Sequence, residues 1–433
     1  MTDTMLLIRR PIFLGLLGLW FAAGALAAGL DGVWAITITR FGEPSYRRAT
    51  IKTSGDRLSG QMDEMPLEGT GHGEAVAFTT RDKDGKVIGD FKGSTIEGVL
   101  VGTAKLHDEA VSWTGQRRAE RPVGEPKAHR FFPRTFYREF SGAIAPVMHL
   151  FPGDSVTTTT VDAGGRDANG KQRSLGGNPL TGPFYIENAW PGDTLVVHFT
   201  RIRLSRDSAG SGDGIVGSAF DPYYFKDLKP VEKFDSEWKL DRERGVATLK
   251  NPTEKLKNLS IKLAPMLGCV GVAPPGRNAF QSGHLGSFGG NMDYNQIREG
   301  VTVYFPVYHP GALLFVGDGH AVEGDGELTG DALETSMDVE FTVDVVQGQS
   351  IDMPRAENGE YVMALGIGNS LTDALQAATT NLAQWLERDY KLNAAEVAMV
   401  LGTSMRYDVA EVVDPRVNVV AKAPKSVLSQ LRQ

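Results

Sequence analysis

The chain has 433 residues, a net charge of −8 and an apolar fraction of 41%. This length favours two domains, and the acidic balance without a Lys/Arg run argues against a nucleic-acid partner. With 51 Gly and 22 Pro, much of the chain must form turns, which favours short strands over long helices. A single Cys excludes an internal disulfide.

The N-terminal residues have the pattern of a secretory signal peptide. Arg9 and Arg10 precede an apolar stretch from Ile12 to Ala23, and Ala25-Leu26-Ala27 fits a signal-peptidase site. We therefore expect residues 1–27 to be removed, which predicts a periplasmic or secreted protein with no stable membrane anchor. The alternative is an uncleaved anchor, but the apolar stretch is short for a membrane span.

Residues 30–118 predict a small antiparallel β-barrel. They hold six to eight short strand-like runs, among them Thr95–Leu100, with turn signals at Ser54-Gly55 and Asp84-Gly85. The Gly-x-Trp start at residues 32–34 is typical of a lipocalin-like barrel, in which closure leaves no free edge. The barrel has no ionisable cluster, so we interpret it as a spacer or stabilising module rather than a ligand carrier. Residues 119–128, charged and proline-containing, indicate an exposed linker.

Residues 129–433 predict a larger domain rich in strands and ending in helices. The expected elements include strands at Val156–Asp162, Thr194–Leu204, Val301–Val307, Leu313–Val316 and Met337–Val346, a helix at Leu371–Tyr390 capped by Ser370, and a helix that begins at Asn393 and ends at Gly402. The predicted fold class is therefore mainly β: an N-terminal antiparallel β-barrel, then a larger β-sandwich-like domain with C-terminal helices.

The stretch from residue 289 to residue 334 places polar side chains at the ends of two apolar runs. These polar residues are Asn291, Asp293, Asp318, His320, Glu323, Asp325, Glu327 and Glu334. Carboxylates and an imidazole at the mouth of an apolar scaffold suit a metal or acid–base site. Asp318 and His320 are two residues apart, so both point to one face if the strand continues. Glu323 and Glu327 join them only if the chain bends at Val322–Gly324. The alternative is an Asp/Gly-rich surface turn.

This stretch also resembles the acetamidase/formamidase family. The matching pieces are APMLGCVGVAP at Ala264–Pro274, GGNMD at Gly289–Asp293 and PGALLFVGDGHAVEGDGE at Pro310–Glu327, with a weaker likeness from about His129 to near the C-terminus. The resemblance implies hydrolysis of a short linear amide to a carboxylate and ammonia. Many family members carry His where this chain has Phe288, and His284 is a candidate substitute for it.

The sequence has neither the serine-nucleophile motif G-x-S-x-G nor the zinc-protease motif H-E-x-x-H. Cys269, in an apolar run, is most simply a buried residue. We therefore expect water, activated by a divalent metal, to attack the amide. Asp293, Asp318 and His320 are the predicted metal ligands. The imidazole favours zinc, and an all-oxygen shell would suit calcium.

Glu327 is the first candidate for moving a proton from water to the leaving nitrogen, and Glu323 is the second. Asn291 and Asp162 are candidate substrate-binding residues, although Asp162 is equally explained as a strand-end cap. The competing hypothesis is a non-catalytic exported binding protein with a structural calcium site. A small-molecule amide is the expected partner, and a homo-oligomer is possible.

Overall fold

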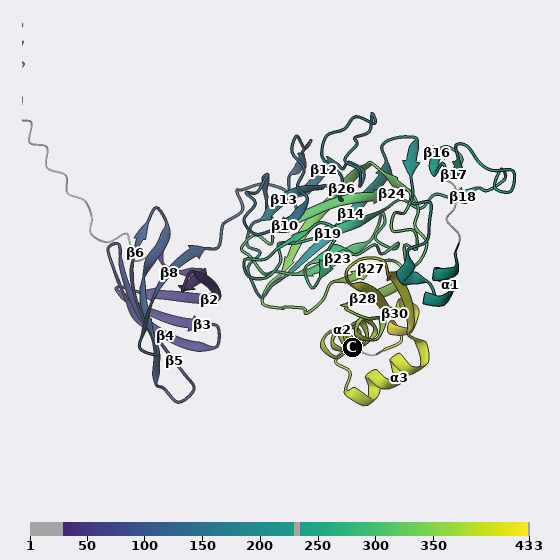
Figure 1. The fold of residues 1–433 in the computed structure, drawn as a ribbon. Helices are drawn as coiled ribbons and strands as arrows, with labels where there is room; N and C mark the ends of the chain where they lie inside the picture. Colours follow the sequence, from purple (N-terminus) through teal and green to yellow (C-terminus); the bar gives the residue numbers. More distant parts are fainter. Residues whose placement is uncertain (1–28, 229–233, 432–433) are drawn as a thin grey trace, which may run out of the picture. The chain divides into compact units, whose positions relative to one another are not determined.

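The computed structural model describes residues 29–228 and 234–431. They form two compact units that divide between Arg118 and Ala119, and both units are built mainly from strands (Figure 1). The predicted signal peptide, residues 1–27, lies outside the described residues. None of the helices in the described part of the chain is both long and apolar enough to cross a membrane.

The first unit is a closed eight-stranded barrel, in which each strand pairs antiparallel with the next and β1 pairs with β8. The strands are β1 (Gly32–Arg40), β2 (Glu43–Ser54), β3 (Arg57–Met62), β4 (Met65–His72), β5 (Ala75–Arg81), β6 (Val87–Ile96), β7 (Val99–Leu106) and β8 (Glu109–Arg117). Large side chains fill the interior. The rings of Phe78 and Phe91 stack at 4.7 Å, and Trp113 meets both edge-on. The barrel interior is thus a packed hydrophobic core.

Two details of the barrel differ from the sequence prediction. The predicted strand Thr95–Leu100 instead crosses the turn between β6 and β7, where Glu97 and Gly98 have φ of 50° and 81°. Strand β4 was not predicted because Pro66 and two glycines make Met65–His72 a weak strand sequence. Pairing with β3 on one side and β5 on the other overrides that local preference.

The second unit contains two large sheets. The eleven-stranded sheet comprises β11 (Met148–Leu150), β13 (Leu180–Ile186), β15 (Ser208–Gly210), β16 (Glu237–Asp241), β17 (Val246–Leu249), β18 (Ile261–Lys262), β19 (Met266–Gly271), β21 (Leu285–Gly286), β22 (Gly289–Asn291), β24 (Leu314–His320) and β25 (Glu334–Thr335). The nine-stranded sheet comprises β9 (Ala128–Arg130), β12 (Ser155–Thr159), β14 (Thr194–Leu204), β23 (Thr302–Pro306), β26 (Met337–Val346), β27 (Arg355–Glu357), β28 (Tyr361–Gly368), β29 (Arg406–Glu411) and β30 (Val417–Pro424). A further pair is β10 (Glu139–Ser141) with β20 (Ala279–Gln281).

Side chains of both sheets share one hydrophobic core. Phe184 on β13 and Phe341 on β26 belong to different sheets, and their ring centroids lie 5.4 Å apart. This contact is what a β-sandwich requires, because each sheet covers the apolar face of the other. The mainly β fold with a barrel, further sheets and a few C-terminal helices is as predicted.

The helices are α1 (Pro222–Asp227), α2 (Leu371–Tyr390), α3 (Ala394–Ser404) and α4 (Lys425–Leu428), with a short 3-10 helix, η2 (Gly217–Ala219). Helix α2 packs on β28 and β30 through Leu382 and its neighbours. The predicted caps are present, since Ser370 caps α2 and Asn393 forms a capping box at α3. Helix α3 continues past Gly402 to Ser404, whose hydroxyl donates to the carbonyl of Val400 one turn earlier.

The predicted linker is exposed but fastened to the second unit. Both backbone groups of Ala119 hydrogen-bond to the side chain of Asn188, at 2.8 and 3.0 Å. Arg121 lies 3.0 Å from the buried carboxylate of Asp154. These contacts make residues 119–127 part of the second unit's surface rather than a free spacer.

Candidate active site

Strand register in the eleven-stranded sheet gathers the candidate site. Strand β24 lies between β19 and β25, and His320 is the cross-strand partner of Glu334. Asp318 and His320 lie on one face of β24, as predicted, with Asp318 Oδ1 3.6 Å from His320 Nε2. Nε2 is also 3.1 Å from a carboxylate oxygen of Glu334.

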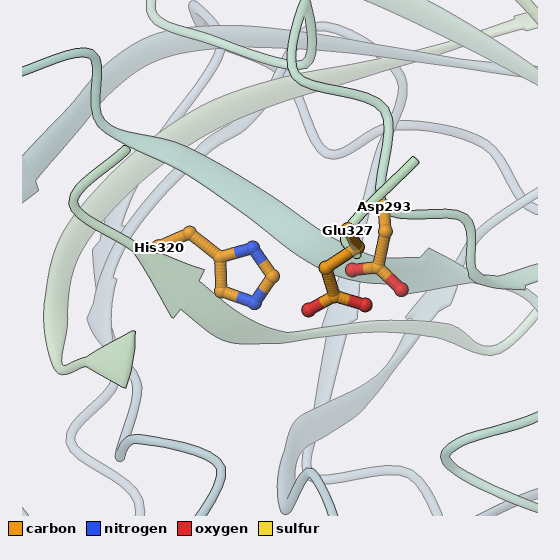
Figure 2. Close-up of side chains that lie close together, drawn as sticks. All are labelled: Asp293, His320 and Glu327. Carbon is orange, nitrogen blue, oxygen red and sulfur yellow. The ribbon is translucent and has the colours of Figure 1, made fainter. Parts of the chain in front are cut away.

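The chain bends directly after His320, which brings two further carboxylates to the same face. Strand β24 ends at His320, and Glu323 Oε2 lies 2.8 Å from His320 Nδ1. Asp293, His320 and Glu327 each offer one donor atom, and these atoms lie within 4.8 Å of one another (Figure 2). The sequence required a bend at Val322–Gly324 for a joint site, and the structure has the bend slightly earlier, at Ala321.

These residues form one buried set, which we call the carboxylate cluster: Asp293, Asp318, His320, Glu323, Glu327 and Glu334. Each member is at most 9% exposed. Several donor atoms have no hydrogen-bond partner, namely both oxygens of Asp293, Asp318 Oδ1, His320 Nε2, Glu323 Oε1 and Glu334 Oε2. Because burying an unpaired charge costs free energy of folding, we expect these atoms to bind protons or a cation.

Gly268 on β19 leaves open the space among the donor atoms. A Cβ at this position would overlap Asp293 Oδ1 and would lie 2.9 Å from Asp318 Oδ2 and 3.1 Å from His320 Cε1. The backbone of β19 therefore forms one wall of the cluster, and any larger residue here would intrude on the donors.

Burial and mutual repulsion hold protons on the cluster. Burial raises the pKa of Glu323 to about 7, of Glu334 to about 8 and of Glu327 to about 9. The pKa of Asp293 is raised well above its ordinary value by burial and then by Glu327. Burial alone would lower the pKa of His320, but Glu334 and Asp318 raise it well above its ordinary value. A divalent cation would displace such protons, since it stabilises the ionised carboxylates.

Three members of the cluster have left-handed backbone conformations that non-glycine residues rarely adopt. The φ angles are 39° for Asp293, 57° for Asp318 and 47° for Glu327. Such conformations cost on the order of 1–3 kcal/mol each and persist only where the surroundings impose them. Their coincidence at one place is typical of a functional site.

Asp318 accepts a hydrogen bond from Asn178, a residue that was not predicted from the sequence. The Nδ2 of Asn178 donates to Asp318 Oδ2 and to Asn291 Oδ1, both at 3.0 Å. Asn291 in turn donates to Asp414, and Cys269 Sγ lies 2.6 Å from Asn291 Oδ1. Burial raises the pKa of the Cys269 thiol well above its ordinary value, so the thiol stays protonated. Asn178 and Asp414 both lie in segments that resemble the acetamidase/formamidase family, so the resemblance could have identified them as site residues.

The structure places the remaining candidates around the cluster. Both oxygens of Asp162 are occupied, by the Arg166 N–H and the Arg206 guanidinium, so Asp162 lies outside the cluster as a turn cap and ion-pair partner. Phe288 is 3% exposed and packs at 5.4 Å against both Phe280 and Phe140. His284 lies near the Phe280 ring, and the potential metal-binding groups of the described residues do not include it.

Comparisons with known proteins find similarity to one family. Residues 284–429 match the model of the Acetamidase/Formamidase family. The chain is 25% identical over 194 residues to a formamidase of Methylophilus methylotrophus, covering 35% of this chain and 47% of that protein. It is 30% identical over 139 residues to an acetamidase of Mycolicibacterium smegmatis, covering 27% and 34%. The chain thus spans less than half the length of these curated relatives.

Solved structures match over a longer range. A predicted acetamidase/formamidase of Thermoanaerobacter tengcongensis superposes with a TM-score of 0.61 at 26% identity, covering 71% of this chain and 99% of that one. An acetamidase of Yersinia enterocolitica superposes with a TM-score of 0.60 at 26% identity, covering 72% and 95%.

Proposed function

Because the C-terminal unit is similar to the acetamidase/formamidase family, we propose that this protein hydrolyses the carbon–nitrogen bond of a small linear amide. Water supplies the oxygen of the carboxylate product, and the nitrogen leaves as ammonia. The observation that carries the proposal is the carboxylate cluster, which combines buried unpaired donors, strained backbone and an open centre beside Gly268.

The same donors fit a divalent metal ion. We propose that Asp293, Asp318 and His320 hold it, with Glu334 as a further donor. Zinc is the favoured ion because Nε2 of His320 offers a nitrogen ligand, whereas calcium takes oxygen ligands. When bound, such an ion polarises a carbonyl oxygen and lowers the pKa of water from about 15.7 to about 7.

The protein's own groups fix the orientation of the donors. The Glu323 carboxylate lies against Nδ1 of His320, which leaves Nε2 directed at Asp318 and Glu334. A carboxylate that holds the second nitrogen of a ligating imidazole is a common supporting arrangement at metal sites. We therefore propose that Glu323 is a positioning residue, and this leaves Glu327 as the catalytic carboxylate.

Glu327 is suited to move the proton. One of its oxygens, Oε1, accepts the backbone N–H of Ala332 at 3.1 Å, which fixes the carboxyl group beside His320 and Asp293. In the proposed reaction Glu327 accepts a proton from the attacking water and delivers it to the amide nitrogen. The delivery is needed because an amide nitrogen leaves poorly unless it is protonated.

Ammonia release from formamide, acetamide and propionamide tests the proposal. Purified protein should release ammonia, a chelator should abolish the release, and added zinc should restore it. Metal content measured on the same sample should fall and recover together with the activity. A metal-loaded protein that binds calcium and hydrolyses none of these amides would favour the alternative, a non-catalytic binding protein.

We also propose that the protein acts outside the cytoplasm, on the strength of the N-terminal sequence. Cell fractionation and N-terminal sequencing of the mature protein test this, with a new terminus near Ala28 as the expected result.

A further inference from the structure

A cavity of about 330 Å³ reaches the carboxylate cluster at Glu334. Glu334 is 9% exposed, the most exposed of the six cluster residues, whereas Asp293 and His320 are fully buried. Asp331, which also lines the cavity, is close enough to the cluster for Asp318 to raise its pKa after burial. The cavity therefore offers a path from solvent to the cluster.

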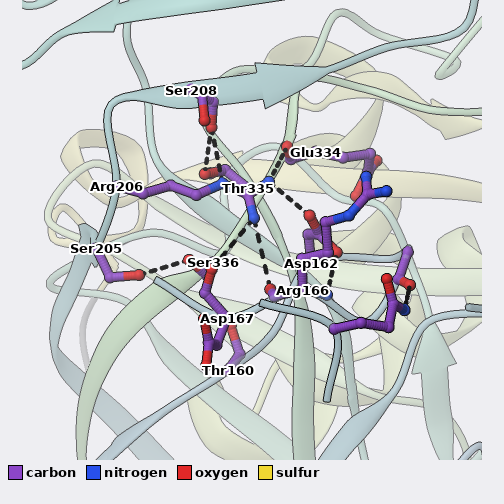
Figure 3. Close-up of polar contacts among 12 residues, drawn as sticks. Thr160, Asp162, Arg166, Asp167, Ser205, Arg206, Ser208, Glu334, Thr335 and Ser336 are labelled. Atoms are coloured by element: carbon purple, nitrogen blue, oxygen red, sulfur yellow. Dashed lines mark hydrogen bonds and ion pairs between the residues drawn. The ribbon is translucent and has the colours of Figure 1, made fainter. Parts of the chain in front are cut away.

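Arg206 lines this cavity and holds the strand that carries Glu334 through a hydrogen bond to the Glu334 carbonyl. Its side chain is 10% exposed, and Nη2 donates to Asp162 Oδ2 at 2.5 Å and to the carbonyl of Glu334 at 3.2 Å (Figure 3). Its Nε donates to the carbonyl of Ser208 at 2.9 Å. One buried guanidinium thus links the loop after β12, strand β15 and strand β25, so the cavity is preformed.

A second cavity, of about 490 Å³, is a weaker candidate for the path. It is lined by Arg138 and reaches the cluster region only through Asn178. The Nδ2 group of Asn178 is already committed to Asn291 and Asp318, so this side chain closes the cavity toward the cluster.

The charges of the first cavity are unequally paired. Asp162 pairs with Arg206, and Glu237 pairs with Lys250 at 2.6 Å. Among the described residues, no carboxylate forms an ion pair with the guanidinium of Arg166, which is exposed on the loop that borders the cavity. Among the described residues that line the cavity, Arg166 is therefore the one cation without an ion pair, and Asp331 and Glu334 are the carboxylates not paired with Arg or Lys.

The cavity is larger and its wall is more polar than binding of formamide or acetamide requires. About 330 Å³ corresponds to the share of roughly ten water molecules, whereas acetamide has only four heavy atoms. Glycine, serine and charged residues dominate the wall, which does not suit an aromatic or aliphatic amide.

Resting on the proposed function, we infer that this cavity binds the substrate, and that the substrate is a short linear amide with a carboxylate at its far end. The amide group lies toward Glu334, and Arg166 binds the carboxylate. Arg166 is thus a specificity-determining residue, since a guanidinium matches a carboxylate with two parallel hydrogen bonds.

Matched substrates and ligands test the inference on the full-length, metal-loaded protein. Succinamate and butyramide are compared as substrates because they differ mainly in the terminal carboxylate. Levulinate and 2-pentanone, in which a methyl ketone replaces the amide, are compared by calorimetry as ligands that cannot be hydrolysed. Each charged member should be favoured by about two- to fivefold, the gain expected for an exposed charged pair.

Substitution of Arg166 should remove this preference. In Arg166→Gln, KM for succinamate should rise until it approaches KM for butyramide, and Arg166→Lys should keep part of the preference. Arg166→Glu should shift the preference toward β-alaninamide, which carries a cation at the far end. Arg138→Gln, in the second cavity, is the matched control and should leave the preference intact.

The outcomes separate this inference from the proposed function. If no amide is hydrolysed but levulinate binds in an Arg166-dependent way, the proposed function fails and the binding site stands. If amides are hydrolysed with no preference for the carboxylate, or if only Arg138→Gln removes it, the inference is overturned. If there is neither hydrolysis nor levulinate binding, both are overturned.

Discussion

Gly268→Ala is the most direct perturbation of the carboxylate cluster, because Gly268 has no donor atom of its own. The added methyl group would overlap Asp293 Oδ1 and stand 2.9 Å from Asp318 Oδ2. Overpacking of a buried site costs about 1–3 kcal/mol. Replacing Gly by Ala in an ordinary backbone conformation returns about 0.4–1 kcal/mol through the unfolded chain. The net loss of stability should be at most about 2.6 kcal/mol, which leaves a folded protein.

The functional loss should be much larger than the loss of stability. Since the methyl group occupies the centre of the donors, Gly268→Ala should lose stoichiometric metal and measurable ammonia release. Metal content by mass spectrometry, amide turnover and thermal unfolding are measured on the same preparation. Gly402→Ala is the matched control, because a Cβ there meets nothing within 4 Å and should stabilise helix α3. Wild-type metal affinity in Gly268→Ala would refute the reasoning that this space is a metal site.

Five further predictions rest on named contacts. Glu327→Gln should keep the metal and lower the rate by roughly 10² to 10⁴, because the amide side chain cannot accept the proton. His320→Ala should lose the metal, while Glu323→Gln should weaken metal affinity by about 10- to 100-fold because the imidazole loses its orienting partner. Burial raises the pKa of Asp154, but backbone N–H groups and basic side chains outweigh it and lower the pKa overall. Asp154→Asn should therefore cost about 1–3 kcal/mol at neutral pH. A chain that begins at Ala119 should fold and keep the activity, since residues 119–127 pack on the second unit.

Each of these has its own measurement and a contrary result. Metal content and rate of Glu327→Gln distinguish the roles of Glu327. Loss of metal together with activity would make Glu327 a metal ligand. An unchanged rate would remove it from the mechanism. Full metal content in His320→Ala would contradict the assignment of ligands. Equal metal affinity in Glu323→Gln and wild type would remove its positioning role.

The pH dependence of Asp154→Asn follows from the sign of the shift. A carboxyl whose pKa is lower in the folded state stabilises the protein above its unfolded pKa of about 3.9, and this stabilisation is lost as pH falls through the folded pKa. The difference in unfolding free energy between wild type and Asp154→Asn should therefore shrink below about pH 4. A difference that stays constant across this range would contradict the argument.

Insoluble protein from the chain beginning at Ala119 would show that the barrel is needed for folding.

The sequence by itself determined the features that depend on local periodicity and capping. The helix Leu371–Tyr390 and its cap at Ser370 follow from side-chain spacing and one hydroxyl group, and the structure has both. The i, i+2 spacing of Asp318 and His320 placed them on one strand face for the same reason. Strand β4 was not predicted because its residues have low strand propensity. It forms a strand because it pairs with β3 and β5.

Only the tertiary structure decided what surrounds His320. Strand register places Glu334 opposite His320, and the bend after β24 returns Glu323 to its Nδ1. Asn178 is 140 residues from Asp318 in the chain yet donates to its carboxylate. No local pattern encodes such contacts, because pairing between strands depends on the packing of the whole sandwich. The sequence thus determined which groups carry the chemistry, and the fold decided which of them meet and which are left without a partner.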